Sequence, residues 1–215
     1  MNDYKTISND CIAEIVQHKS RFIARAAPAE NEAHAIQIIN EVKKTHSAAS
    51  HHVYAYICRE NNSQRYSDDG EPSGTAGVPV LEVLKKQGLT DACIVVTRYF
   101  GGTLLGTGGL LRAYGKAASS AVLAAIPINM IYSDVFEITT DYGALGKLQY
   151  EISESGFILL NSDFGENITL KVCTETNRSD ELITRIADAS LGKAHVKKVS
   201  TLYVARSMKG KNSYD

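Results

Sequence analysis

The chain has 215 residues, with 23 Lys and Arg against 24 Asp and Glu, so its formal net charge is −1. Hydrophobic residues make up 44% of it and charged residues 22%, which is ordinary for a globular protein and enough for one or two apolar cores. This balance excludes the overall basic field of many nucleic-acid-binding proteins, so any such binding must come from a local patch.

The chain begins with a polar stretch, MNDYKTISND, which lacks the apolar segment of a signal peptide. No apolar run approaches the roughly 18 residues that a membrane helix needs. The four cysteines are widely spaced and form no C-x-x-C pair, which argues against a zinc ribbon or a redox pair. Cys58 and Cys93 lie in apolar, strand-like runs, so we expect buried thiols there. These features favour a cytoplasmic protein that makes no use of a membrane.

The first part of the chain predicts a mixture of strands and helices. A helix is expected over residues 29–45, because Ile36, Ile39 and Val42 fall on one helical stripe. The run ACIVVTRY at residues 92–99 is rich in β-branched side chains and predicts a buried strand. The other expected elements are strands at residues 11–19, 20–27 and 52–59, a turn at 61–63, and helices at 79–87 and 108–125.

The character of the sequence changes between Pro127 and Ser133. Beyond this point we expect strands at residues 134–140, 157–164, 167–174 and 195–205 and helices at 144–155 and 179–189. The order β-α-β-β-α-β is that of the ferredoxin-like split motif. We therefore predict an α+β protein with an N-terminal domain (1–130), a ferredoxin-like C-terminal domain (131–207) and a polar tail (208–215).

Ten of the sixteen glycines lie between residues 66 and 116, in two loops that each lead into a helix. In the second loop, GGTLLGTGG, Thr107 is expected to cap the helix and leave the Gly108 and Gly109 amides open, which favours an anion site. The alternative is that the glycines only allow tight packing of strand against helix. The pattern matches neither a Walker A loop nor G-x-G-x-x-G. The candidate anion- or nucleic-acid-binding residues are Arg98, Gly101, Gly102, Gly106, Thr107, Gly108, Gly109, Arg112 and Lys116.

The first loop, SDDGEPSGTAG, is acidic at its start. Asp68, Asp69 and Glu71 are weak candidates for holding Mg²⁺ through oxygen ligands, although a solvated acidic turn explains them as well. The small residues that follow suggest a second group of open amides at a helix start. The candidate residues of this loop are Asp68, Asp69, Gly70, Glu71, Ser73, Gly74, Thr75 and Gly77.

His51 and His52 precede a strand, so at most one of them faces a shared site. His51 is a candidate general base or metal ligand, and the alternative is a hydrogen-bonded strand residue. Lys19, Ser20 and Arg21 lie between two strands, where they form either a turn or a basic edge. The sequence contains no nucleophile elbow and no H-E-x-x-H motif.

Four segments resemble the IMPACT/YigZ family of bacteria and eukaryotes: HKSRF at residues 18–22, ASHHVYAY at 49–56, YSDDGEPSGTAGVP at 66–79 and VVTRYFGGTLLGTGGLLRAYGKAA at 95–118. The resemblance covers the whole chain. It implies an N-terminal domain with the left-handed β-α-β fold of elongation factor G domain IV and of some ribosomal proteins. It also implies a C-terminal domain like domain V of that factor. Eukaryotic relatives are described as translation regulators that compete for the activator of a starvation-responsive kinase.

Three functions are consistent with these residues. The first is a non-enzymatic, translation-linked protein that binds RNA, the ribosome or a translation-related protein through the second loop, without DNA-specific readout. The second is an enzyme that binds a nucleotide or phosphate ester at the same loop, with Mg²⁺ at the acidic loop. The third is a protein–protein regulator that docks a partner through Tyr99, Phe100 and Leu104. No cofactor is predicted, and Mg²⁺ is the alternative.

Overall fold

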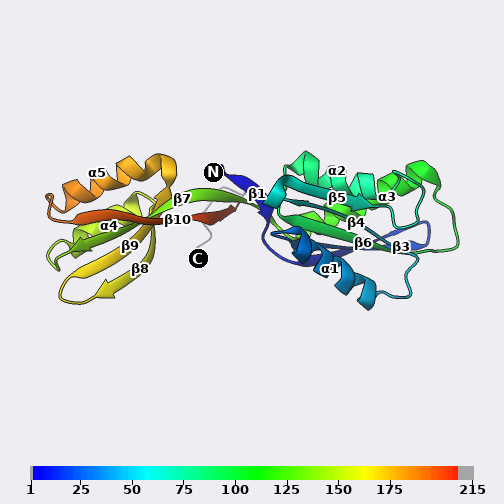
Figure 1. The fold of residues 1–215 in the computed structure, drawn as a ribbon, viewed down its shortest axis with the longest axis horizontal. Coiled ribbons are helices and arrows are strands. Elements are labelled where there is room, and N and C mark those ends of the chain that lie inside the picture. The colour runs from blue at the N-terminus through cyan, green and yellow to red at the C-terminus, as the bar shows by residue number, and fades with distance from the viewer. Residues whose placement is uncertain (1, 208–215) are drawn as a thin grey trace. The chain divides into compact units, whose positions relative to one another are not determined.

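The computed structural model describes residues 2–207 of an α+β chain that divides into two compact units (Figure 1). The first unit is Tyr4–Asn129 and the second consists mainly of Met130–Arg206. The predicted polar tail at 208–215 lies outside the described residues. No helix in the described part of the chain is long and apolar enough to cross a membrane.

The first unit contains a five-stranded sheet in the order β2-β3-β6-β4-β5, in which every neighbouring pair is antiparallel. Its strands are β2 (Cys11–Gln17), β3 (Ser20–Pro28), β4 (His51–Cys58), β5 (Ser63–Ser67) and β6 (Ala92–Tyr99). A short 3-10 helix, η1 (Glu60–Asn62), stands where the turn was predicted. Two strands were not predicted, β5 and β1 (Tyr4–Ile7), because both are short and SQRYS lacks the apolar alternation of a half-buried strand.

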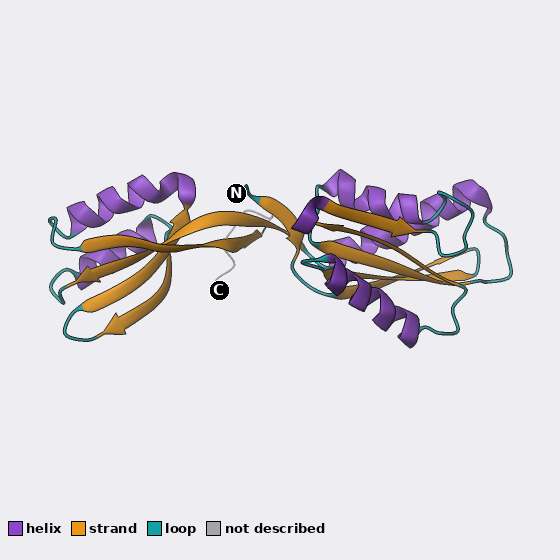
Figure 2. Ribbon diagram, in the orientation of Figure 1, coloured by secondary structure: helices purple, strands orange, loops and turns teal. Residues whose placement is uncertain are grey.

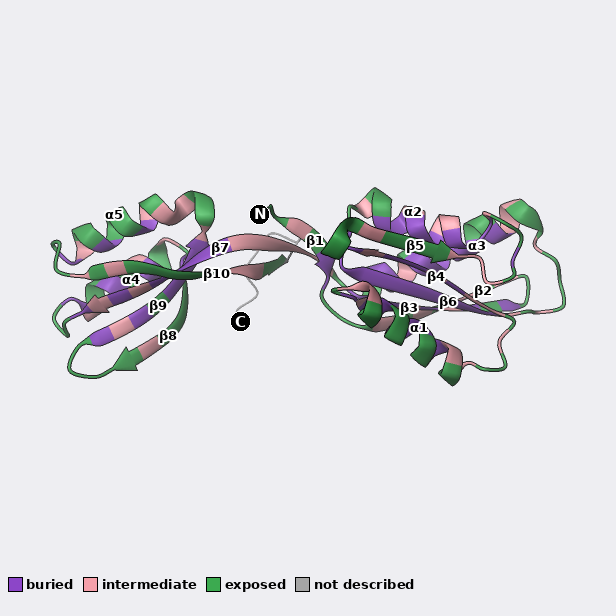
Figure 3. Cartoon of the chain, in the orientation of Figure 1, coloured by how far each residue is buried: buried purple, intermediate pink, exposed green. Residues whose placement is uncertain are grey.

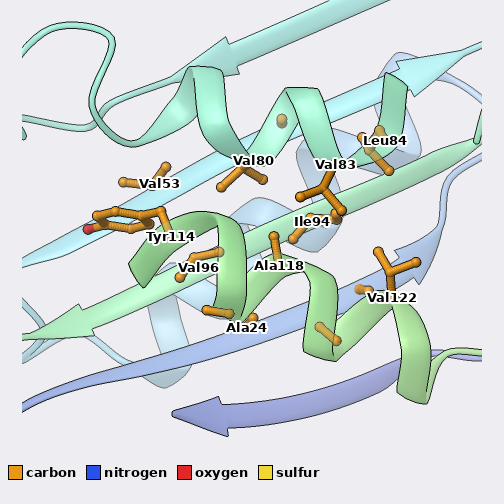
Figure 4. Packing of buried hydrophobic residues seen from close by; sticks show 14 of the residues in the cluster. Ala24, Val53, Val80, Val83, Leu84, Ile94, Val96, Tyr114, Ala118 and Val122 are labelled. Carbon is orange, nitrogen blue, oxygen red and sulfur yellow. The ribbon is translucent and has the colours of Figure 1, made fainter. Parts of the chain in front are cut away.

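Helices cover both faces of this sheet (Figure 2). α1 (Glu32–Thr45) packs on one face against β4 and β6. α2 (Gly77–Gln87) and α3 (Gly106–Ala124) pack on the other face. The apolar core on the side of α3 is built around Tyr114, whose ring meets Phe22 edge-on at 5.1 Å, with alanines of α3 facing the sheet (Figure 4). Because alanine is small, α3 lies close to the strands.

Two crossover connections in this sheet have opposite hands. β3 and β4 are parallel and are joined through α1, whereas β5 and β6 are parallel and are joined through α2. The two connections cross the sheet in opposite directions, between oppositely directed strands, and their helices lie on opposite faces. A half-turn about an axis perpendicular to the sheet superposes the strands of one connection on those of the other, but the two helices stay on opposite faces. The two connections therefore have opposite hands, and one of them is left-handed. Such connections are rare, and this one confirms the predicted left-handed β-α-β unit.

Local signals set the start of α1 later than predicted. Asn31 precedes the helix in an extended conformation, and its side chain accepts a hydrogen bond from the His34 N–H at 2.9 Å. The helix therefore begins at Glu32 rather than at residue 29. Its buried stripe is formed by Ala35, Ile38, Ile39 and Val42, whereas Ile36, which was predicted to be on that stripe, is 46% exposed.

The second unit has the predicted β-α-β-β-α-β order. Its elements are β7 (Pro127–Thr140), α4 (Leu145–Glu154), β8 (Ile158–Phe164), β9 (Ile168–Glu175), the short 3-10 helix η2 (Thr176–Arg178), α5 (Ser179–Ala189) and β10 (His195–Ser207). The strands lie in the order β10-β7-β9-β8, and β1 also pairs with β7. In motif order this is 4-1-3-2, which confirms the ferredoxin-like fold. Figure 3 shows that β8, the edge strand, is largely exposed, whereas β6 in the first unit is buried along its length.

Candidate functional site

Strand register gathers the predicted site residues at one end of the first unit. Arg21 pairs with Tyr99, His51 with Arg98, and Tyr54 with Ser67, so the start of β3, the end of β6, the start of β4 and the end of β5 coincide (Figure 1). α3 begins beyond the loop that follows β6. We call this region the loop end, and it comprises residues 18–19, 46–50, 68–76 and 100–105 together with the first part of α3, residues 106–116.

The first glycine loop is closed by its own carboxylate. Asp68 accepts hydrogen bonds from the backbone N–H groups of Gly74 (2.9 Å), Ala76 (3.0 Å) and Gly77 (2.8 Å). Burial opposes ionisation here, but the three donors outweigh it and hold the pKa of the Asp68 carboxyl below its usual range. Of the amides predicted to be open, those of Gly74 and Gly77 therefore donate to Asp68, and that of Thr75 donates to the Pro72 carbonyl.

Close backbone approach explains two of the glycines. A Cβ on Gly77 would lie 2.8 Å from the Ser67 carbonyl group, and one on Gly101 would lie 2.1 Å from the Lys19 carbonyl carbon. Gly70 and Gly74, by contrast, adopt positive φ angles of 87° and 74°. Close packing at the first two positions and backbone conformation at the other two explain these glycines without a ligand.

A buried ion pair connects the two loops. Arg98 Nη1 donates to Glu71 Oε1 at 2.6 Å, and the two side chains are only 6% and 4% exposed. The same oxygen accepts the Tyr114 hydroxyl at 2.7 Å. Burial, together with this hydrogen bond, raises the pKa of Tyr114 far above its usual range, so the hydroxyl stays protonated and donates. Arg98 and Glu71 are therefore paired with each other, so this geometry does not favour the predictions that Arg98 contacts an anion and that Glu71 holds Mg²⁺.

The remaining acidic residue of the loop is also engaged. Asp69 Oδ2 accepts the His52 backbone N–H at 2.6 Å, and the Asp69 carbonyl accepts the His51 Nδ1 proton at 2.8 Å. Lys43 Nζ lies 3.5 Å from Asp69 Oδ1. Within residues 2–207 no group of three or more His, Cys, Asp or Glu is placed to hold a metal ion. His51 thus holds the first loop through its hydrogen bond to the Asp69 carbonyl. Asp68, Asp69 and Glu71 are not arranged around a common cation position in the described residues.

The second glycine loop ends where α3 begins, at Gly106 rather than at residue 108. Thr107 is therefore not the cap as predicted: the residue before the helix is Leu105, and no side chain caps the first turn. The first N–H groups of a helix have no partner within it, and the residue before α3 supplies no side-chain acceptor for those of Gly106, Thr107 and Gly108. Gly102 and Gly106 have positive φ angles of 78° and 68°, which side chains rarely adopt.

Arg112 differs from every other arginine in the chain. Of the nine arginines, eight lie within ion-pair distance of a carboxylate, and Arg112 has no such partner among the described residues. Its guanidinium points back along the helix, because a Cβ on Gly108 would lie 3.5 Å from Arg112 Nη1. Lys116, one turn later, and Lys19 are also exposed and have no ion pair in this part of the chain. The start of α3 thus combines open amides with an unpaired guanidinium.

Two exposed apolar side chains flank these cations. Leu104 is 86% exposed and Phe100 is 50% exposed, with the Arg98 guanidinium 5.5 Å from the Phe100 ring. Arg21 was a candidate for a basic edge, but it is paired with Glu14 through two hydrogen bonds of 2.9 and 3.0 Å. Tyr114 was not predicted as a partner of Glu71. The sequence feature that could have indicated it is a single tyrosine in an alanine-rich helix.

Both units match known domain families. A model described as the Impact N-terminal domain matches residues 18–122, and one described as a domain of unknown function (DUF1949) matches residues 138–193. The chain is 38% identical over 209 residues to the IMPACT family member YvyE of Bacillus subtilis, covering 97% of this chain and 96% of that protein. It is 33% identical over 177 residues to the IMPACT family member YigZ of Escherichia coli, covering 81% and 87%.

Two more distant similarities cover different shares of the chain. Protein IMPACT of Danio rerio is 34% identical over 98 residues, which is 43% of this chain and 30% of that protein. A crystal structure described as that of a hypothetical protein is similar over 93% of this chain and 98% of its own, with a TM-score of 0.59 and 28% identity. The two-unit architecture therefore recurs in a solved structure.

Proposed function

This chain belongs to the IMPACT family, and from that premise we propose that it is a translation-linked binding protein that contacts RNA phosphates of the ribosome through the loop end. The translation link comes from the family resemblance. The chemistry comes from the loop end: backbone amides and a few Arg and Lys side chains are the groups that position proteins on a phosphate backbone. Such contacts need little net charge, which is consistent with a formal charge of −1.

The observation that carries this proposal is the unpaired guanidinium of Arg112 beside the open amides of α3. An arginine without a carboxylate partner keeps its donors available for a phosphate, to which it binds in bidentate fashion. The helix N-terminus adds positive potential at the same place. Lys19 and Lys116 extend the positive charge, and the exposed ring of Phe100 offers a face for stacking a base.

An enzyme acting on a phosphate ester is less well supported. Its proposed metal ligands, Asp68 and Glu71, are used for backbone and arginine contacts. A hollow of about 440 Å³ lies between α2 and α3, but its lining includes Val83, Leu111 and Gly115 and none of the acids of the first loop. A small-molecule site usually combines a pocket with convergent polar groups, and here the two are separate.

Co-sedimentation with purified bacterial ribosomes tests the proposal. Binding should be strong at low salt and should fall by roughly 0.7 log units per log unit of salt for each single-stranded phosphate neutralised. The variant Arg112→Glu with Lys116→Glu should lose binding while keeping its thermal unfolding midpoint. Lys85→Glu with Lys86→Glu is the control matched in charge, because both lysines are exposed, have no ion pair in the described chain and lie in the last turn of α2, away from the loop end.

Two results would count against RNA. Binding that withstands high salt but is lost in Leu104→Ala would indicate a protein partner, since burial of an apolar side chain resists salt. No ribosome binding at any salt would reject the proposal, and thermal-shift screening of nucleotides with Mg²⁺ would then test the enzyme alternative.

A further inference from the structure

We propose that Glu71 is the positioning residue of the loop end: a buried carboxylate that touches no ligand but fixes three segments of this surface, two of which carry its exposed cations. This inference rests on the proposed function, since it explains how the binding surface is held in shape. Its basis is a continuous set of hydrogen bonds that joins the first loop to the Lys19 turn, to residues 100–105 and to α3.

The first branch reaches α3. Glu71 Oε1 accepts the Tyr114 hydroxyl at 2.7 Å, and Tyr114 is fully buried. Tyr114 follows Arg112 by only two residues on the same helix, so fixing its ring fixes the rotation of the turn that presents the Arg112 guanidinium. The edge-on contact with Phe22 at 5.1 Å holds the ring from the side of the sheet.

The second branch reaches the other two segments. Glu71 holds Arg98 at 2.6 Å, and Arg98 Nη2 donates to Ser20 Oγ at 3.3 Å. Ser20 Oγ also accepts the Gly101 backbone N–H at 3.2 Å, and Ser20 directly follows Lys19. One carboxylate therefore anchors both the turn that carries Lys19 and the loop that carries Phe100 and Leu104.

A purely electrostatic role of Glu71 and a positioning role predict opposite changes in RNA affinity when the carboxylate is neutralised. It is a negative charge close to a surface proposed to bind anions, so if charge were its only effect, neutralising it would strengthen RNA binding. If it positions the surface, neutralising it loosens the Arg98 contact and weakens binding. Glu71→Gln keeps the size of the side chain and its ability to accept hydrogen bonds, so the sign of the change separates the two effects.

The test measures ribosome affinity as a function of salt for Glu71→Gln. We expect roughly tenfold weaker binding at low salt with an unchanged salt slope, because no phosphate contact is lost. Arg112→Ala should differ by lowering the slope by roughly 0.7 to 0.9, as expected when one phosphate contact is removed. Glu60→Gln, an exposed glutamate with no ion pair in the described residues, is the matched control and should leave affinity unchanged or slightly raised.

A second measurement is independent of the ligand. Hydrogen exchange of the Gly101 amide should be at least about tenfold faster in Glu71→Gln than in the unaltered protein, because a weakened Arg98 contact releases Ser20 Oγ. Should Glu71→Gln not fold, Tyr114→Phe removes one donor from the same oxygen and should shift both readouts in the same direction by less.

The outcomes are distinct. Tighter or unchanged ribosome binding by folded Glu71→Gln overturns the positioning role, as does unchanged exchange at Gly101. Failure of the unaltered protein to bind ribosomes rejects the proposed function instead, and the exchange measurement then still decides whether Glu71 holds the loops.

Discussion

Each unit buries a carboxylate that several polar groups surround, but the two carboxylates hold different kinds of segment. In the second unit Asp134 accepts from Thr176 of η2 and from Ser179, the first residue of α5, and pairs with Lys198 of β10 at 2.7 Å. These partners belong to regular elements that the ferredoxin-like fold already places. In the first unit Glu71 itself lies in a loop, and its partner Arg98 also contacts Ser20, whose side chain accepts from the loop residue Gly101. There a buried ion pair, rather than a strand or helix, holds the loop in place.

The arginines of the two units differ in the same sense. In the second unit Arg178, Arg185 and Arg206 each have a carboxylate partner. In the first unit Arg112 has none among the described residues. Charges that neutralise one another contribute little to recognition, whereas an unpaired guanidinium on an ordered helix is available to a ligand. Among the arginines of the described residues, the one without a carboxylate partner therefore lies in the first unit.

The largest effect should come from removing the buried cation of the first unit. Arg98→Met leaves Glu71 buried without a charged partner, which should cost about 3 to 5 kcal/mol of unfolding free energy. Lys198→Met is the matched change in the second unit, where the lysine is 48% exposed and Asp134 keeps two hydroxyl donors, so about 1 kcal/mol or less is expected. Denaturant titration measures both, and equal losses would show that Glu71 and Asp134 depend on their cations to the same extent.

Glycine replacement should separate the units next. Gly101→Ala places a Cβ 2.1 Å from the Lys19 carbonyl carbon, so the backbone must shift, at a cost of about 1 to 3 kcal/mol. Gly146→Ala in α4 meets nothing within 4 Å and should be neutral or stabilising by up to about 1 kcal/mol. Thermal unfolding of both variants checks this, and a stable Gly101→Ala would show that the loop adapts easily.

Acid should weaken the first unit through Asp68. Because its folded pKa is lowered, its contribution to stability is complete above the unfolded pKa of about 3.9 and is lost as the pH falls through the folded value. Asp68→Asn should cost about 1 kcal/mol at neutral pH, on the scale of a helix cap, and should flatten the acid dependence. Unfolding measured from pH 7 to pH 2 tests it, and an unchanged acid slope would contradict the assignment.

Thiol labelling should show the smallest difference. Burial raises the pKa of Cys58 to about 11 and also raises the pKa values of Cys93 and Cys173, and all three are buried. Cys11 is only half-buried. Under native conditions a thiol reagent should therefore modify Cys11 first and leave the second unit unlabelled. Peptide mass spectrometry after brief exposure reads this out, and early labelling of Cys173 would indicate that the second unit opens.

Local sequence signals predicted most of the elements but not the contacts between loops. The β-branched run of β6 and the helix of residues 179–189 were predicted to the residue, because periodicity and end signals act locally. The glycine count located the loop end. The pairing of Glu71 with Arg98, 27 residues apart, depends on the strand register, so no local pattern indicates it. The same holds for Asp68. The sequence shows an acidic turn that resembles a metal site, but it does not show that Asp68 accepts from three backbone N–H groups.

The position of β6 has a consequence for synthesis of the chain. It is the last strand of the five-stranded sheet to be synthesised, yet it lies in the centre of that sheet, between β3 and β4. Until Ala92–Tyr99 has left the ribosome, β2 with β3 and β4 with β5 can exist only as separate hairpins, which are marginally stable in water. A nascent chain stalled before residue 92 should therefore be a target for chaperones and proteases, and one extended past α3 should resist them.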